Sequence, residues 1–248
     1  MKSWNTKKGS RIIKVLSGRS NAYLILKDHD AILVDTGKTS SLKTLKKNLN
    51  SLNISIEDIS FIILTHTHFD HCQSAEKIKE ISDCKIIISG AAEDSVRNGY
   101  TKLPDGSFLI TKLIARIGRL IGKSKFGYEP FRHDILVNGD FDIKVGNSEI
   151  KIVKTTGHSA DSVSILVDSE IAIVGDVMFG VFNNSVFPPY LEDTKEMIES
   201  WKKLLNTGCK IFLPGHGKEI NRNLLQKEYE KYARKPRPSQ SPLPPPSA

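Results

Sequence analysis

Three histidines and one aspartate lie within the seven-residue run Thr65-His66-Thr67-His68-Phe69-Asp70-His71. Four apolar residues, 61–64, come directly before it and predict a buried strand. The whole chain holds seven histidines, so three in one short run form a strong signal, although a polar loop that happens to be rich in histidine is the alternative. Imidazole nitrogen and carboxylate oxygen are ligands that zinc, iron and manganese accept. The run therefore predicts a metal site in a loop at the end of a strand.

Three further apolar runs, at 150–153, 171–174 and 210–213, predict buried strands of the same kind. Each run leads to a loop that contains glycine and one potential ligand: His158, Asp176 or His216. Loops held at strand ends by a rigid sheet are where folds commonly place reactive groups. We therefore expect one cleft to contain His66, His68, Asp70, His71, His158, Asp176 and His216.

The motifs occur in the order His-x-His-x-Asp-His, Gly-His-Ser, Gly-Asp and Pro-Gly-His. This order resembles the metallo-β-lactamase superfamily over about residues 12 to 220. Asp35 in Leu33-Val34-Asp35-Thr36-Gly37 is similar to the family's early strand-end aspartate, which supports a ligand histidine through its other ring nitrogen. The resemblance implies an α/β fold, namely a four-layered αββα sandwich of two mixed sheets flanked by helices.

The resemblance also implies a role for each candidate ligand. One metal ion would be held by His66, His68 and His158. A second would be held by Asp70, His71 and His216, with Asp176 bridging the two. The expected cofactors are two divalent metal ions, with Zn²⁺ as the first expectation and iron or manganese as alternatives. Two such cations lower the pKa of a shared water toward about 7. Asp70 would be the catalytic residue that orients this water and passes a proton to the leaving group.

These expectations describe a dinuclear metal-dependent hydrolase that uses a metal-bridging hydroxide to cleave a small ester, thioester or lactone. Two departures from the family narrow this interpretation. Asp176 stands where some true β-lactamases have cysteine, and Ser159-Ala160-Asp161 replaces the commoner Thr-Pro-Gly. A phosphodiesterase or nuclease on the same metal site is one alternative. A mononuclear iron oxygenase and a non-catalytic metal-binding module are the others.

Composition bounds the class of protein. The chain has 248 residues, of which 39% are hydrophobic and 26% charged, as in globular proteins. No apolar run approaches the roughly 18 residues of a transmembrane helix, and no apolar signal core follows the basic N-terminus. The three cysteines, Cys72, Cys84 and Cys209, are too widely spaced for a disulfide framework and predict reduced thiols. We therefore expect a cytoplasmic protein acting on a small molecule. The net charge of +8 leaves nucleic acid as a further partner.

The order of elements predicts a single metallo-β-lactamase-like domain over residues 1–235, with a helical insertion at about 91–135 and a flexible Pro/Ser-rich tail at 236–248. Strands are expected at 11–16, 22–26, 31–34, 61–64, 85–88, 141–145, 149–154, 162–167, 171–174 and 211–213. Helices are expected at 40–52, 74–81, 108–123, 193–205 and 223–234. The helix at 108–123 is amphipathic and basic. It is expected to pack on the body of the domain, with a lid, a homodimer surface or a membrane-contacting element as alternatives.

Two histidines fall outside the candidate ligand set. His29 lies between two predicted strands, in Lys27-Asp28-His29-Asp30, which is typical of a hairpin turn. His133 precedes Asp134 and is expected to be a surface histidine, with a place in the substrate cleft as the alternative. Cys72 follows His71 directly and is expected to be a small buried side chain.

Overall fold

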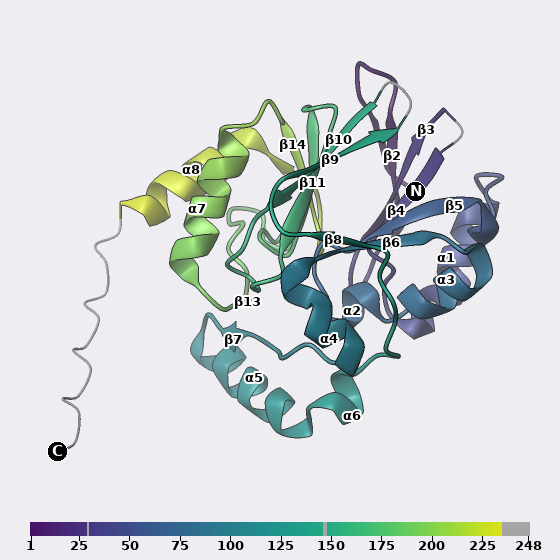
Figure 1. The fold of residues 1–248 in the computed structure, drawn as a ribbon. Helices are drawn as coiled ribbons and strands as arrows, with labels where there is room; N and C mark the ends of the chain where they lie inside the picture. Colours follow the sequence, from purple (N-terminus) through teal and green to yellow (C-terminus); the bar gives the residue numbers. More distant parts are fainter. Residues whose placement is uncertain (29, 146–147, 235–248) are drawn as a thin grey trace.

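A computed structural model describes residues 1–28, 30–145 and 148–234 of the chain. The expectations of a hairpin turn at His29 and of a flexible tail at 236–248 lie outside the described residues. The described segments form two large sheets and a two-stranded one. Figure 1 shows the two large sheets in the middle of the molecule with helices on both sides.

The first sheet has seven strands in the order β1-β2-β3-β4-β5-β6-β8. Its strands β1 to β4 pair antiparallel, whereas β4, β5, β6 and β8 run parallel to one another. The sheet is therefore mixed, as expected. Its members are β1 Ser3–Asn5, β2 Arg11–Leu16, β3 Ala22–Lys27, β4 Asp30–Val34, β5 Ile59–Ile63, β6 Lys85–Ser89 and β8 Ile135–Val137.

The second sheet has six strands in the order β15-β14-β12-β11-β10-β9. Only the β12–β14 pair is parallel, and the other pairs are antiparallel. This sheet is also mixed. Its members are β9 Phe141–Val145, β10 Ser148–Lys154, β11 Val163–Val167, β12 Ile171–Gly175, β14 Ile211–Pro214 and β15 Ile220–Asn221.

Alternation of side chains along the strands produces three hydrophobic layers. In β12, Ile171 and Ile173 face the first sheet, while Ala172 and Val174 face the helices on the other side. In β5, Ile62 packs toward helices and Ile63 packs between the sheets. Each sheet thus buries both of its faces, which is the arrangement that an αββα sandwich requires.

Helices cover the outer faces of both sheets (Figure 1). α1 Leu42–Asn50, α3 Ala75–Ser82 and α4 Glu93–Asn98 supply residues to the layer outside the first sheet. α7 Thr194–Leu205 and α8 Arg222–Ala233 supply residues to the layer outside the second sheet. Trp201 anchors α7, because its buried indole Nε1 donates a hydrogen bond to the Val177 carbonyl at 2.7 Å. Short 3-10 helices at Thr39–Ser41, Ile56–Asp58 and Gly90–Ala92 complete the connections.

The segment between β6 and β8 carries additional elements. The pair of β7 Asp105–Gly106 with β13 Tyr190–Leu191 forms the two-stranded sheet. α5 Leu109–Ile121 and α6 Lys123–Phe126 follow β7 and lie at the bottom of the view in Figure 1. Among the described residues, no helix has both the length and the apolarity needed to cross a membrane.

The longer expected elements agree with those observed to within two residues at each end. The expected helix at 74–81 is preceded by a further short helix, α2 Phe69–Cys72, which carries part of the histidine-rich run. The short strands β1, β7, β8, β13 and β15 were not expected. Each has two or three residues, which is too few for a hydrophobic period to show.

Candidate metal centre

Four loops that follow β5, β10, β12 and β14 meet at one edge of the two sheets. Backbone hydrogen bonds hold these loops together across the sheets. Val163 N donates to Thr65 O at 2.8 Å, and Gly215 N donates to Gly175 O at 2.7 Å. Gly157 brings its loop against α7, where an added Cβ would lie 2.3 Å from Met197 N. Its φ of +128° is also one that favours glycine, so the loop needs this residue.

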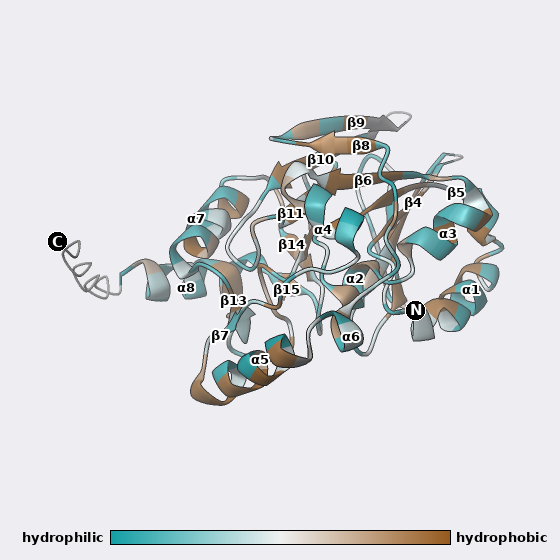
Figure 2. Cartoon of the chain, turned by 60° about the horizontal axis from the view of Figure 1, so that its bottom comes forward, coloured by the Kyte–Doolittle hydropathy of each residue, from teal (hydrophilic) through white to brown (hydrophobic). Residues whose placement is uncertain are grey.

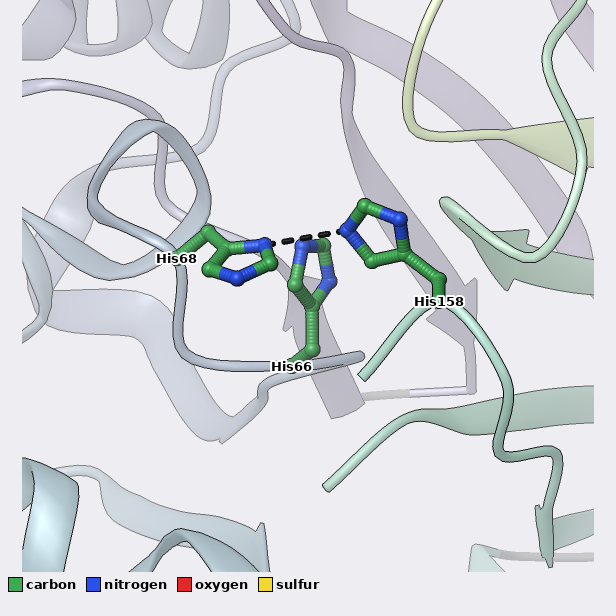
Figure 3. Close-up of side chains that lie close together, drawn as sticks. All are labelled: His66, His68 and His158. Atoms are coloured by element: carbon green, nitrogen blue, oxygen red, sulfur yellow. Dashed lines mark hydrogen bonds between the residues drawn. The ribbon is translucent and has the colours of Figure 1, made fainter. Parts of the chain in front are cut away.

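One group of potential ligands consists of His66, His68 and His158 (Figure 3). Their potential ligand atoms all lie within 4.8 Å of one another. Nδ1 of His68 lies 3.0 Å from Nε2 of His158, and all three residues are buried. Three imidazole nitrogens therefore converge from two loops that are about 90 residues apart in the sequence.

A second group consists of Asp70, His71 and His216, whose potential ligand atoms also lie within 4.8 Å of one another. Nε2 of His71 and Nε2 of His216 are 3.4 Å apart. Asp70 Oδ2 lies 3.8 Å from His216 Nε2. Asp70 and His71 belong to α2, so one turn of helix places both side chains on the same site.

Asp176 lies between the two groups. Its Oδ2 is 3.7 Å from His158 Nε2 and 3.9 Å from His66 Nε2, both in the first group. The same oxygen is 3.1 Å from His216 Nε2, and Oδ1 is 3.5 Å from His71 Nε2, both in the second group. The structure thus brings all seven predicted side chains together around one buried carboxylate.

The ring orientations leave nitrogens free to face the centre. Thr65 Oγ1 lies 3.0 Å from His66 Nδ1, and Nδ1 of His158 donates to Tyr190 O at 2.9 Å. Both contacts involve Nδ1 and hold the imidazole ring in one orientation. Nε2 of each histidine therefore points toward the other ligands. Supporting contacts of this kind are typical of metal-binding histidines.

Two buried atoms at the centre fit a bound cation. His66 Nε2 and Asp176 Oδ1 have no hydrogen-bond partner in the part of the chain that the structure describes. Buried polar atoms without a partner are costly, and a metal ion would satisfy them. Gly215 also leaves room here, because an added Cβ would lie 2.2 Å from Asp176 Oδ1 and 2.6 Å from His71 Cε1. The residues present therefore fit divalent metal ions.

Burial and charge set the protonation of these groups. Burial lowers the pKa of His66 and of His68, and it lowers the pKa of His158 to about 4. Burial tends to raise the pKa of Asp176, but the adjacent His216 and His71 outweigh it and hold this pKa well below its ordinary value. Neutral imidazoles and an ionised carboxylate are the forms that bind cations.

Asp35 supports the second group, as the sequence predicted. Its Oδ2 accepts a hydrogen bond from His71 Nδ1 at 2.8 Å, and its Oδ1 accepts one from Thr65 N at 2.8 Å. Burial lowers the pKa of His71, yet the charges of Asp176 and Asp35 outweigh burial and raise it well above the ordinary value. Asp35 is held at a φ of +60°, a strained conformation of the kind found at functional sites.

Two residues at the site were not identified from the sequence. Asp161 Oδ2 accepts hydrogen bonds from Thr67 N at 2.8 Å and Thr67 Oγ1 at 2.7 Å, and so ties the His158 loop to the histidine-rich run. The departure from Thr-Pro-Gly at residues 159–161 was the available signal for it. Arg19 Nε lies 3.5 Å from Asp70 Oδ2, and nothing in the local sequence marked this residue.

A cavity of about 340 Å³ opens above the candidate ligands. His68, Asp70, His158, Asp176 and His216 line its metal side. Its other walls are mainly apolar and include Leu103, Ile114, Phe126 and Phe179. The Phe179 ring stacks on His216, with centroids 4.7 Å apart. His133 is not among the residues that line this cavity, and Cys72 is buried as expected.

Comparisons with known proteins agree with this geometry. A family model described as "Metallo-beta-lactamase superfamily" matches residues 17–216. A solved metallo-β-lactamase from Cronobacter sakazakii, a motif mutant, superposes with a TM-score of 0.69 at 17% identity, and 94% of each chain is covered. This likeness confirms the expected fold. The chain belongs to the metallo-β-lactamase superfamily.

Two curated relatives are similar over most of this chain. A "Beta-lactamase-like protein 2 homolog" from Caenorhabditis elegans is 29% identical over 208 residues, which are 82% of this chain and 57% of the relative. An "Atrochrysone carboxyl ACP thioesterase" from Aspergillus fumigatus is 24% identical over 237 residues, 92% of this chain and 62% of the relative. The chain therefore spans less than two thirds of the length of each of these proteins.

Proposed function

We propose that the seven clustered side chains hold two zinc ions. His66, His68 and His158 would hold the first, Asp70, His71 and His216 would hold the second, and Asp176, which lies between the two groups, would serve both. The donor set supports this assignment, because imidazole nitrogens and carboxylate oxygens suit zinc and no thiolate takes part. The two groups of three ligands and the position of Asp176 between them support it further.

The proposed reaction is the hydrolysis of a small ester, thioester or lactone. When bound, zinc ions polarise a carbonyl oxygen and lower the pKa of water toward about 7. The observation that carries the proposal is the cavity, which is lined both by the ligand cluster and by apolar side chains. Such a wall accommodates the hydrocarbon part of an acyl group, while the reacting carbonyl faces the histidines. A relative that is named a thioesterase is consistent with this substrate class.

Asp70 is the proposed proton carrier. Its carboxylate lines the cavity, and Oδ2 lies 3.5 Å from Arg19 Nε and 3.8 Å from His216 Nε2. From this position Oδ2 accepts the proton that the attacking water loses. The same oxygen then returns the proton to the leaving alkoxide or thiolate, so that the products are an acid and an alcohol or thiol.

The residues that line the cavity between positions 103 and 126 belong to the segment between β6 and β8. We propose that this segment, at about 91–135, is an insertion in the domain that shapes the substrate pocket. Leu103, Ile114 and Phe126 are its apolar contributions to the cavity. Variation in such segments on a constant scaffold is a common source of substrate choice.

Elemental analysis of the purified protein, followed by assays on thioester, ester, lactone and phosphodiester compounds, tests this proposal. The expected result is two zinc ions per chain and turnover of one of the first three classes. One iron per chain with oxygen consumption would instead support an oxygenase. Turnover of phosphodiesters alone, with binding that weakens steeply as salt rises, would support the nuclease alternative that the net charge of +8 favours.

A further inference from the structure

The outer surface of α5 is strongly apolar. Five of its side chains expose more than half of their surface to solvent: Leu109 at 86%, Ile110 at 75%, Leu113 at 61%, Ile114 at 52% and Leu120 at 84%. Ile117, and Phe108 directly before the helix, are also exposed. Figure 2 shows hydrophobic residues along the side of α5 that faces away from the rest of the molecule. Exposed apolar residues that are contiguous mark an interaction site more often than scattered ones do.

The inward side of the helix carries its small residues instead. Ala115 and Gly118 are the buried positions within residues 109–120 of α5, and an added Cβ at Gly118 would lie 2.9 Å from Leu103 Cδ1. At 100° per residue, Leu109, Leu113 and Leu120 fall within one narrow stripe, well away from Ala115 and Gly118. The helix therefore packs inward through its small-residue side, and its large apolar side chains face outward.

The segment around α5 carries only positive charge. No acidic residue occurs between Asp105 and Glu129, whereas this stretch contains five basic residues. They are Lys112, Arg116, Arg119, Lys123 and Lys125. Lys112, Arg116 and Arg119 lie on the side of the helix next to the apolar stripe. An apolar stripe beside a basic one is the pattern of a helix that lies in a membrane interface.

We infer that α5 docks this protein on an anionic lipid bilayer, with its axis in the plane of the surface. The helix has 13 residues, a length of about 20 Å, which is shorter than the roughly 30 Å needed to cross the hydrocarbon core. Its leucines and isoleucines enter the acyl region, and its basic residues contact the headgroup phosphates. This inference goes beyond the proposed function and does not depend on it, because it rests on the outer face of the helix alone.

The charges favour a bilayer over a second copy of the chain. Two copies that met through α5 would bring two stripes of like charge together, and the helix itself has no acidic residue to compensate them. Arg119 is paired with Asp105 at 2.5 Å, so the repulsion would come chiefly from Lys112 and Arg116. The negative charges of an anionic lipid surface would instead neutralise the basic stripe. Docking would also bring Ile114, which lines the cavity, close to the lipid. The cavity would then open toward a source of substrates that contain acyl chains.

Co-sedimentation of the full chain with vesicles tests the inference. One set of vesicles contains phosphatidylcholine alone, and the other contains phosphatidylcholine mixed with phosphatidylglycerol. We expect binding to the mixed vesicles and much weaker binding to the neutral ones, with the affinity falling as salt increases. The triple variant Leu109→Gln, Leu113→Gln, Leu120→Gln should bind at least about tenfold more weakly. Glutamine retains helix propensity, so α5 itself is preserved.

Two further variants complete the experiment. Arg116→Gln should weaken binding to the mixed vesicles roughly fivefold. The control Ile81→Gln removes an exposed apolar residue from α3 and should bind as the unmodified chain does. If the unmodified chain remains in the supernatant with mixed vesicles, or the triple variant binds equally well, the inference is overturned. A dimer in sedimentation velocity that the triple variant dissociates would instead assign this face to a second copy.

Discussion

Asp35 Oδ2 and His71 Nδ1 are joined by a hydrogen bond of 2.8 Å, and this contact sets which ring nitrogen of His71 faces the candidate metal centre. Because Nδ1 donates this hydrogen bond to Asp35, Nε2 is the ring nitrogen that would bind a cation; it lies 3.5 Å from Asp176 Oδ1 and 3.4 Å from His216 Nε2. The other carboxylate oxygen of Asp35 is bound to Thr65 N, so the aspartate cannot turn away. One buried side chain thus links the end of β4, the start of the histidine-rich run and a candidate ligand.

Replacing Asp35 by asparagine tests that link. The amide has one acceptor oxygen, so it cannot serve both Thr65 N and His71 Nδ1, and the His71 proton is expected to move to Nε2. We expect zinc affinity to fall by about 10–100-fold, measured by competition with a chromophoric chelator. Asparagine tolerates the left-handed backbone at this position. Asp28→Asn, at an exposed residue with a φ of +51°, is the matched control.

His66→Ala tests the first ligand group. The variant should lose metal from this group and should lose nearly all turnover, because it removes a buried nitrogen that has no hydrogen-bond partner and lies 3.9 Å from Asp176 Oδ2. Metal content by elemental analysis and the hydrolysis rate are the two measurements. His133→Ala changes a histidine outside the cluster and should retain both values. A full metal complement with full activity in the His66 variant would remove this residue from the site.

Asp70→Asn tests the role of Asp70 in proton transfer separately from its role in holding metal. Asparagine keeps the shape of the side chain but cannot accept the proton at Oδ2, so kcat should fall by about 10²–10⁴. The stability should change far less than the turnover. Metal content is measured on the same sample, since loss of metal would lower kcat for another reason. Asp94→Asn, at a side chain that is 88% exposed, provides the control, and an unchanged kcat in the Asp70 variant would reject the proposed role.

Asp161→Ala removes the tie between two ligand-bearing loops. Its loss leaves Thr67 N and Thr67 Oγ1 without their acceptor in a buried position, so the free energy of unfolding should fall by about 1–3 kcal/mol. Urea unfolding measures this change. Asp161→Asn keeps one acceptor oxygen and should lower the free energy of unfolding by less than Asp161→Ala does. Asp142→Ala, at an exposed position on β9, should have little effect, and equal stability of all three variants would contradict the assignment.

Gly215→Ala tests the space between Asp176 and His71. The added methyl group would lie 2.2 Å from Asp176 Oδ1, so the centre has to shift to accept it. We expect weaker zinc binding and a loss of about 1–3 kcal/mol in unfolding free energy. In Gly139→Ala the same methyl group meets no atom within 4 Å, and this variant should behave as the unmodified chain. Equal effects of the two substitutions would show that the space at Gly215 is not needed.

The sequence by itself was enough to predict the fold class, the longer strands and the seven side chains that the structure gathers at one edge. Strand periodicity and ligand motifs are local patterns, and a parallel or mixed sheet brings successive strand ends to the same edge. The role of these side chains as metal ligands stays a prediction. Asp35 was also found from its motif, and its contact with His71 is confirmed.

Tertiary structure alone decided the rest. Asp161 and Arg19 reach the site across loops that are far apart in the chain, and a side-chain hydrogen bond over 94 residues leaves no local pattern. The periodicity of α5 showed that the helix has an apolar face but not the direction in which that face points. That direction depends on Ala115 and Gly118, whose small size lets the inner side of the helix pack closely, as at the contact between Gly118 and Leu103.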